Sequence, residues 1–163
     1  MKTILALDLG TNMGFALYDK KIKSGVKHFK ASRFEDVNCR FEKFEDFLHE
    51  VRKNCGVLGL SKIYFEAVRR HIGTDAAHCY GGFMAVLIVF CGRNKISYQG
   101  VPVGTIKKHI TGKGNADKVA VIKAIQALGF NPKDDNEADA LALLDYALAQ
   151  EGAASSNSKC GKS

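Results

Sequence analysis

A short apolar run near the N-terminus constrains the fold of this chain more than any other feature. Residues 3–8, TILALD, are apolar up to a closing acid. A strand with apolar side chains at successive positions is buried on both faces, which happens where helices cover both sides of a sheet. The run therefore predicts the central strand of an α/β domain.

Two further strand patterns follow directly and predict an antiparallel meander. The turn LGTNMG separates the first strand from a second, FALYD. Residues 22–30, IKSGVKHFK, are lysine-rich with scattered apolar positions, which is typical of an edge strand that discourages unwanted pairing.

Helix and strand patterns alternate along the rest of the chain. Apolar residues at steps of three and four predict an amphipathic helix over residues 36–55. The elements predicted after it are a strand (KIYFEAV), a helix (about 74–93), a strand (KISYQGV), and helices at about 104–110, 115–128 and from Asp134 or Asp135 to Gln150.

This order predicts one α/β domain, residues 1–151, built on a five-stranded mixed sheet flanked by helices. Three antiparallel strands would come first, followed by two parallel strands. The stretch 152–163 is small and polar, and we expect it to be a disordered tail.

Charge and cysteine content narrow the class of protein. Of its 163 residues, 24 are lysine or arginine and 17 are acidic, so the formal charge of +7 is compatible with a nucleic-acid partner. The five cysteines include no CxxC pair, which favours free thiols in a reducing compartment over a zinc site or disulfides. Asp8 interrupts the N-terminal apolar run too early for a signal peptide, and the uncharged run 76–92 is shorter than a typical membrane span. We expect no membrane association and a cytoplasmic location, in a bacterium or in the host cell of a phage.

Three acids share one sequence context. Asp8 closes the first apolar strand, Glu66 closes the fourth, and Asp139 lies near the start of the last helix. Strand ends at one edge of an α/β sheet usually carry the ligands, and carboxylates that meet there repel one another unless a divalent cation offsets their charge. Asn136, one turn before Asp139 on the same helix face, offers a neutral oxygen that Mg²⁺ accepts, and Asp135 is the alternative. The pattern indicates a two-metal nuclease.

Each of these residues also has a purely structural interpretation. Asp8 could cap its Gly-Thr turn, Glu66 could pair with an arginine that follows its strand, and Asp139 could complement the helix dipole. Asn136 could be no more than a helix cap. A common cluster is favoured because all three acids lie at the ends of elements.

A lysine-rich loop offers a phosphate clamp. In IKKHITGKGNADK, Gly112 and Gly114 let backbone amides approach a phosphate closely, and the segment leads into a helix start. The alternative is a solvated basic surface. Two arginines and His71 follow Glu66 after two apolar residues and would extend the clamp. The residues expected to bind DNA are Arg69, Arg70, Lys107, Lys108, Lys113 and Lys118.

Four stretches together resemble one known family. ALDLGTNMG, IYFEAVRRH, IKKHITGKGNADKVAVIKAI and NEADALALLDYAL occur in the order and at the spacing of the RuvC-type Holliday junction resolvases, which belong to the ribonuclease H-like superfamily. The resemblance spans roughly residues 3–150. It implies a ribonuclease H-like fold and a structure-specific endonuclease that resolves four-way DNA junctions by paired, Mg²⁺-dependent hydrolysis of phosphodiester bonds.

The resemblance also implies roles for individual residues. The family's basic residues match Lys107 and Lys118. The implied catalytic residues are Asp8, Glu66, Asn136, Asp139 and Lys118, of which the first four would hold two Mg²⁺ ions, with Mn²⁺ as a substitute. The chain departs from the family at Asn136, where Asp or His is usual, and near Arg69, where the family often has an aromatic residue that stacks in the junction.

The helix predicted over residues 74–93 is apolar almost all round. Its large apolar residues, which we expect to be distributed around the helix, are Tyr80, Phe83, Met84, Leu87 and Phe90. One interpretation is a homodimer contact, because two sites related by a two-fold axis suit a junction that is cut on two strands. The other is a deeply buried core helix. The resemblance favours the dimer, since RuvC-type resolvases dimerise through the corresponding helix.

Three other functions stay open. A turn similar to DLGT lies near the phosphates in actin-like ATPases and sugar kinases, but those proteins need two lobes and a second Asp-Gly motif. A related ribonuclease H-like nuclease would cut flaps, forks or RNA-containing hybrids. A non-catalytic module that binds branched DNA is the third, and Asn136 in place of an acid is its best argument.

Overall fold

The computed structural model describes residues 2–56, 59–70 and 72–152. Most of the predicted tail, together with His71 and Cys160, lies outside the described residues. The strands are β1 (Thr3–Asp8), β2 (Asn12–Asp19), β3 (Lys21–His28), β4 (Leu60–Ala67) and β5 (Ser97–Pro102). The helices are α1 (Cys39–Asn54), α2 (Thr74–Asn94), α3 (Val103–Thr111), α4 (Lys118–Ala127) and α5 (Asp135–Gln150).

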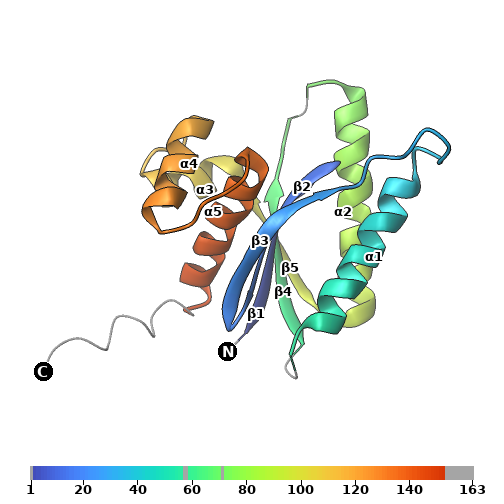
Figure 1. Ribbon diagram of the computed structural model, residues 1–163, viewed down its shortest axis with the longest axis horizontal. Helices are drawn as coiled ribbons and strands as arrows, with labels where there is room; N and C mark the ends of the chain where they lie inside the picture. Colours follow the sequence, from blue (N-terminus) through green and yellow to red (C-terminus); the bar gives the residue numbers. More distant parts are fainter. Residues whose placement is uncertain (1, 57–58, 71, 153–163) are drawn as a thin grey trace, which may run out of the picture.

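The strands form one mixed sheet in the order β3-β2-β1-β4-β5. β1 pairs with β2, and β2 with β3, in antiparallel fashion, whereas β1, β4 and β5 are parallel. This confirms the predicted sheet, with the first strand at its centre. Because the three parallel strands run the same way, their carboxyl ends lie along one edge, uppermost in Figure 1.

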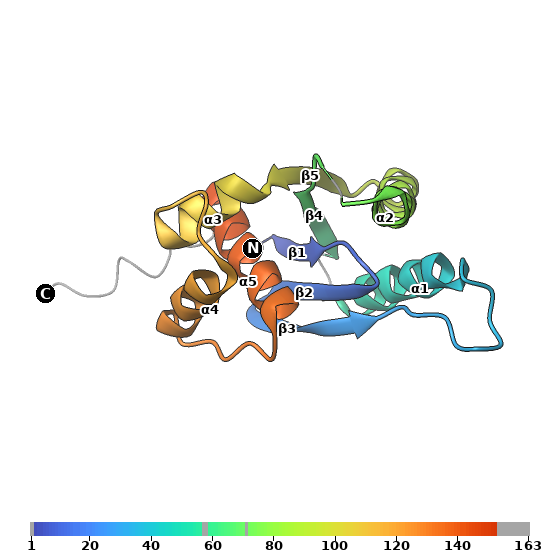
Figure 2. The same cartoon turned by 90° about the horizontal axis from the view of Figure 1, so that it is seen from above.

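Alternate side chains of β1 anchor the two faces of the sheet. Ile4 and Ala6 are fully buried in the cluster formed with α3, α4 and α5. Leu5 and Leu7 are fully buried in the cluster formed with α1 and α2. Seen from above, the two groups of helices cover opposite faces of the sheet (Figure 2). This three-layer arrangement explains why the run is apolar at successive positions.

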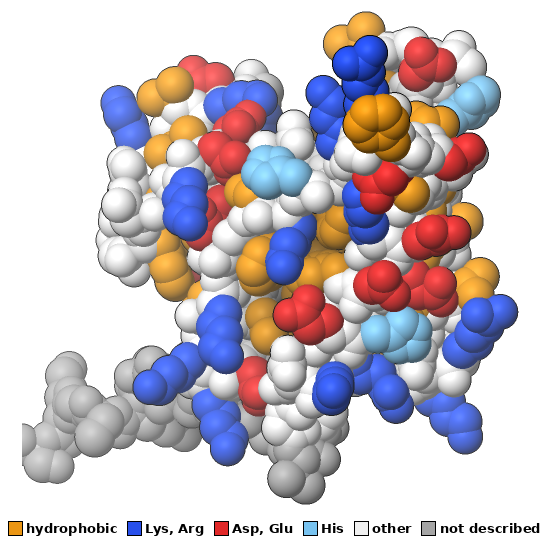
Figure 3. Space-filling view, turned by 45° about the vertical axis from the view of Figure 1, so that its right-hand side comes forward, with side chains coloured by type: hydrophobic (Ala, Val, Ile, Leu, Met, Phe, Trp, Pro, Cys, Tyr) orange, Lys and Arg blue, Asp and Glu red, His pale blue; other side chains and the backbone are white. Residues whose placement is uncertain are grey.

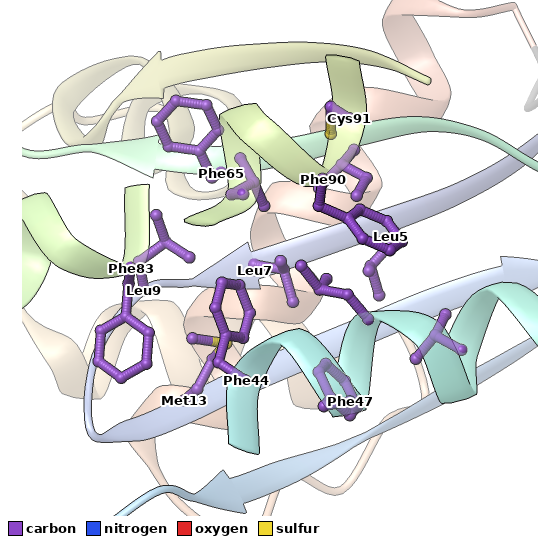
Figure 4. Close-up of a cluster of buried hydrophobic side chains, with 14 of the residues drawn as sticks. Leu5, Leu7, Leu9, Met13, Phe44, Phe47, Phe65, Phe83, Phe90 and Cys91 are labelled. Atoms are coloured by element: carbon purple, nitrogen blue, oxygen red, sulfur yellow. The ribbon is translucent and has the colours of Figure 1, made fainter. Parts of the chain in front are cut away.

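Helix α2 directs its large side chains into the core. Phe83 and Leu87 are fully buried, and Phe90 is nearly so. The Phe83 ring lies 5.3 Å from that of Phe44 in an edge-on contact (Figure 4). It makes a second edge-on contact, at 5.2 Å, with the ring of Phe41, and both partners lie on α1. These contacts join α1 and α2 into one layer.

The prediction that the large residues of α2 are spread around the helix is therefore wrong. The exposed side of α2 carries smaller residues, among them Ala85 and Val89. Among the residues that the structure describes, only α2 has the length and apolar composition of a membrane span. Length and composition alone are weak evidence, and the largest side chains of α2 pack against the sheet and α1.

Two helices begin later than their sequence patterns predict. Helix α1 begins at Cys39 rather than near residue 36, and α4 begins at Lys118 rather than near Asn115. The Asp117 carboxylate accepts a hydrogen bond from the Ala120 N–H at 2.8 Å and so caps α4. Asn and Asp both favour a cap position, which is why the sequence pattern did not decide between Asn115 and Asp117.

Candidate active site

The three predicted acids lie near the carboxyl edge of the parallel strands. Asp8 is the last residue of β1, and Glu66 is the second-to-last residue of β4. Asp139 lies in the second turn of α5, the helix that packs over β1 and β2. In the space-filling view the upper edge of the molecule is hollowed between two raised parts (Figure 3).

A glycine allows α5 to approach the sheet beside Asp8. Gly14 on β2 is the register partner of Asp8 on β1. A Cβ atom at residue 14 would lie 1.8 Å from the backbone oxygen of Asn136 and 2.4 Å from its carbonyl carbon. The obstructing atoms belong to the backbone of α5, so only glycine permits this contact. The first turn of α5 is thereby seated against the strand that pairs with Asp8.

A tyrosine from α2 holds the strand end that carries Glu66. The Tyr80 hydroxyl donates to the backbone oxygen of Glu66 at 2.8 Å and accepts from the Val68 N–H at 3.2 Å. The two bonds lie on either side of Ala67, where β4 ends. They fix the backbone from which the Glu66 carboxylate projects.

Burial and mutual repulsion raise the pKa of all three carboxyls. Burial, followed by the charges of Glu66 and Asp139, raises the pKa of Asp8 to about 8. Burial and the charge of Asp139 raise the pKa of Glu66 to about 7. Burial and the charge of Asp135 raise the pKa of Asp139 to about 6. A site that disfavours negative charge at neutral pH to this extent favours a bound cation.

Lys107 lies against the acids from the side of α3. Its charge opposes the rise in the pKa of both Glu66 and Asp139. Its ammonium donates to the backbone oxygen of Ala116 at 2.7 Å and so ties α3 to the loop before α4. Lys107 is therefore part of the site's framework and not only a candidate phosphate contact.

Lys118 lies at the exposed rim of the site. Its side chain is 71% exposed, and its ammonium pairs with the Asp135 carboxylate. This hydrogen bond raises the pKa of Lys118 and lowers that of Asp135. The charge of Lys118 also opposes the rise in the pKa of Asp8 and Asp139.

One cavity joins two of the acids to the two lysines. Its volume is about 200 Å³, and it is lined by Glu66, Asp139, Lys107 and Lys118. The rest of its lining is aliphatic and consists of Val103, Ile106, Ile110 and Val121. Opposite charges thus share a small, partly apolar recess, in which electrostatic interactions are stronger than in bulk water.

The other basic residues singled out in the sequence are exposed. Lys108 is on α3, Lys113 is in the loop after it, and Arg69 and Arg70 follow β4. Among the ion pairs of the described residues, none joins Glu66 to either arginine, so the purely structural interpretation of that acid receives no support. His71 lies outside the described residues. A role for these residues in binding DNA stays a prediction.

Asn136 does not cap α5. The cap is Asp134, whose carboxylate accepts from the Glu137 N–H at 2.9 Å, so the interpretation of Asn136 as a cap residue is wrong. In the part of the chain that the structure describes, no three Asp, Glu, His or Cys side chains are grouped closely enough to hold one metal ion. The ligand set formed by Asp8, Glu66, Asn136 and Asp139 stays a prediction.

Glu137 was not predicted as a functional residue; it is buried beside the site with an exposed fraction of 5%. Its carboxylate accepts from the Ser24 hydroxyl at 2.7 Å and from the Lys133 N–H at 2.8 Å. The three-residue step from Asp134 to Glu137 is a capping-box spacing, and this signal could have marked the residue. Its partner on β3, distant in the sequence, could not be found from that pattern.

No family model matches the chain. The crossover junction endodeoxyribonuclease RuvC of Caldicellulosiruptor saccharolyticus is 28% identical to it over 148 residues, which are 86% of this chain and 88% of that protein. The alignment therefore runs along most of both chains.

Solved structures have the same fold. Thermus thermophilus RuvC in complex with a Holliday junction substrate matches with a TM-score of 0.72 and 18% identity, over 88% of this chain and 90% of the other. Another structure of Thermus thermophilus RuvC matches with a TM-score of 0.69 and 20% identity, over 92% and 96%. The yeast mitochondrial Holliday junction resolvase Ydc2 matches with a TM-score of 0.62 and 14% identity, over 87% and 75%. Sequence and fold agree: the chain is similar in sequence to a RuvC protein and shares the ribonuclease H-like fold of the RuvC structures.

Proposed function

We propose that this protein is a structure-specific DNA endonuclease that resolves four-way junctions by metal-dependent hydrolysis of phosphodiester bonds. The observation that carries the proposal is the convergence of Asp8, Glu66 and Asp139, from three separate elements, beside a basic loop. A relative aligned along most of the chain is a crossover junction endodeoxyribonuclease, and one protein of the same fold is bound to a Holliday junction substrate. The reaction would take place in the cytoplasm of a bacterium, or of a phage's host cell.

The donor set suits a hard divalent cation, Mg²⁺ first and Mn²⁺ as its substitute. Asp8, Glu66, Asp139 and the amide of Asn136 offer only oxygen to such an ion. Burial, followed by repulsion from the neighbouring acids, raises the pKa of Asp8 to about 8, and a bound cation would offset both effects. When bound, a pair of such ions supplies an activated water and stabilises charge on the leaving oxygen.

The chain's own basic groups would hold the DNA strand against the acids. Lys118 is exposed at the rim and can exchange Asp135 for the scissile phosphate, where its charge stabilises the transition state. Phosphates farther along the strand would be contacted by Lys108, Lys113, Arg69 and Arg70.

The exposed face of α2 supports a homodimer. Val89 is 47% exposed although its side chain is apolar. The residues around it on the incompletely buried side are small or aliphatic and comprise Gly81, Ala85, Ile88 and Gly92. Contact between two copies of α2 would bury this face and relate two active sites by a two-fold axis, as paired incision of a junction requires.

Cleavage of matched substrates tests the proposal. We expect the protein with Mg²⁺ to make paired incisions in a four-way junction and to leave linear duplex intact. The substitutions Asp8→Asn, Glu66→Gln and Asp139→Asn should each abolish cleavage while preserving folding and junction binding, because they remove metal ligands but no DNA contact. Preferred cleavage of flaps, forks or RNA–DNA hybrids would instead identify a related nuclease. Junction binding with no cleavage under any metal would identify a non-catalytic module.

A further inference from the structure

We propose that Glu137 is a positioning residue that fixes the first turn of α5, and with it Asp135, Asn136 and Asp139, relative to the sheet. The inference deepens the proposed function, because it concerns how that site is assembled. Glu137 lies between the candidate ligands in sequence but projects to a different side of the helix from Asp139, since residues two apart do not share a helix face.

The contacts of Glu137 extend well beyond its own helix. One carboxylate oxygen accepts from the Ser24 hydroxyl on β3 at 2.7 Å, across 113 residues of sequence. The other oxygen accepts from the Lys133 N–H at 2.8 Å, which fixes the loop that enters α5. Its own N–H donates to the Asp134 cap at 2.9 Å. The residue thus joins sheet, loop and helix at one point.

This arrangement exceeds what capping α5 requires. Asp134 already satisfies an amide of the first turn, and a glutamate that only complements the helix dipole would be exposed to water. Glu137 is instead 5% exposed, and burial of a carboxylate is costly unless its oxygens are bonded. The buried Glu137 carboxylate is held by Ser24 on β3 and so specifies the position of α5 on the sheet. An apolar residue would specify that position less well, because its contacts are not directional.

Two contacts together define the seat of this turn. The backbone of Asn136 lies directly against Gly14 on β2, in a contact that leaves no room even for a Cβ atom. This contact sets how closely the helix approaches the strand. The bond from Ser24 to Glu137 limits movement of the turn across the sheet, toward or away from β3. Asp8 is the register partner of Gly14, so the same seat sets the distance between Asp8 and the acids of α5.

The test compares Glu137→Ala, Glu137→Gln and Ser24→Ala with a control at the other end of the same helix. Glutamine preserves both contacts, because its amide oxygen accepts from the Lys133 N–H and its amide nitrogen donates to the Ser24 hydroxyl. The control is Glu151→Ala. Glu151 follows α5 and accepts from Lys2, Lys62 and Tyr64, so its loss destabilises the helix without touching the first turn.

Two measurements on the DNA-free protein report position rather than cleavage. They are the dissociation constant of Mn²⁺ and the hydrogen exchange of the backbone amides of residues 135–139. Glu137→Ala should weaken Mn²⁺ binding about tenfold, the loss typical when a residue that orients metal ligands is removed, and should accelerate exchange of these amides. Ser24→Ala should shift both in the same direction by less, and Glu137→Gln should remain close to wild type. Glu151→Ala should lower the melting temperature and change neither.

The proposal is overturned if Glu137→Ala leaves Mn²⁺ affinity and exchange unchanged, or if Glu151→Ala weakens Mn²⁺ binding as much at an equal loss of melting temperature. If Glu137→Ala does not fold, Ser24→Ala must show the shift, and its absence overturns the proposal. Failure of the proposed function would be recognised separately, because a wild-type protein that cuts no DNA can still show these differences in metal affinity and exchange. If the wild-type protein binds no Mn²⁺, the hydrogen exchange of the backbone amides of residues 135–139 alone tests the proposal.

Discussion

Asp8 is the most strongly perturbed of the acids at the residue scale, and its titration makes the stability of the metal-free protein depend on pH. Its pKa in the folded protein is about 8, against an ordinary value of 3.8, chiefly through burial. A raised folded pKa means that the folded state keeps a proton that the unfolded chain has released. The stability linked to this proton is complete below pH 4 and is lost as pH rises through about 8.

Asp8→Asn removes this dependence. In EDTA at pH 8 we expect the variant to be more stable than wild type, by upward of about 1 kcal/mol, since each unit of pKa shift corresponds to about that energy. At pH 5 the advantage should be smaller, because most of the protonated form persists in the wild-type protein. Urea unfolding at the two pH values measures the difference. An advantage that is equal at both would show that the carboxyl of Asp8 does not titrate as its burial indicates.

The identity of the fourth ligand can be decided by two single substitutions. Asn136→Ala should reduce cleavage less than Asp139→Asn, because a neutral amide contributes less to binding Mg²⁺ than a carboxylate does. Asp135→Asn should leave the Mg²⁺ requirement unchanged if Asp135 serves only to hold Lys118. Titration of cleavage against Mg²⁺ concentration compares them. A larger loss of cleavage in Asp135→Asn than in Asn136→Ala would show that Asp135, and not Asn136, is the fourth ligand.

The candidate site shows where sequence reasoning succeeds and where it stops at this scale. Asp8, Glu66 and Asp139 could be predicted because each stands at a recognisable element end. The pairing of Lys118 with Asp135 and the use of Lys107 inside the site could not, since a lysine-rich loop does not show which ammonium points inward. These contacts exist only once α3, α4 and α5 pack together.

The close approach of α5 to β2 gives a prediction at the element scale. Gly14→Ala would place a Cβ atom 1.8 Å from the Asn136 oxygen, and backbone atoms cannot yield without moving the helix. We expect a loss of about 1–3 kcal/mol in the free energy of unfolding, typical of overpacking, together with a severe loss of cleavage. The control is Gly56→Ala, where an added Cβ would meet, among the described residues, the Asp19 carboxylate at 3.9 Å. Normal cleavage by Gly14→Ala would show that the seat of α5 is not needed for the chemistry.

The basic loop after α3 gives a second prediction at this scale. Lys108 and Lys113 are exposed, so replacing both with alanine should weaken junction binding and reduce the slope of log affinity against log salt by about two. The cleavage rate at saturating protein should change little, because neither residue lines the recess. Binding titrations at several salt concentrations measure the slope. The control replaces Arg52 and Lys53, in the last turn of α1, with alanine. An equal change of affinity and salt slope in the control would show that the effect comes from net charge and not from the basic loop.

The elements themselves could be predicted almost completely, and their boundaries less well. Four strands follow from apolar runs, and the lysine-rich β3 follows from its scattered apolar positions. Helix α1 follows from its periodicity, whereas α2 follows from a nearly continuous apolar run. The start of α4 was displaced because several residues before it can serve as a cap, and the packing of Ala116 under Lys107 decides among them. Local propensity therefore specifies each element, whereas contacts between elements choose its ends.

At the scale of the whole molecule, the main feature that could not be predicted from the sequence was which side of α2 faces the sheet. Its nearly continuous apolar sequence shows no polar side, so periodicity does not reveal which residues face the sheet. The structure resolves this by packing Phe83 and Leu87 against α1 and the sheet. Substituting either would damage the core and could not test a dimer. A substitution on the exposed face around Val89 can test the dimer, because it leaves the core intact.

Association through this face is the last prediction. We expect the wild-type protein to sediment as a dimer at micromolar concentration before DNA is added, because a two-fold contact between α2 helices buries Val89 and its neighbours on both copies. Val89→Glu should give monomers with an unchanged circular dichroism spectrum, since the residue is 47% exposed within one chain, and these monomers should lose paired incision of a junction. Leu128→Glu is the matched control, because Leu128 is 51% exposed at the end of α4, on the other face of the sheet. A wild-type monomer that still cuts junctions symmetrically would contradict the dimer, and dissociation by Leu128→Glu as well would place the contact elsewhere.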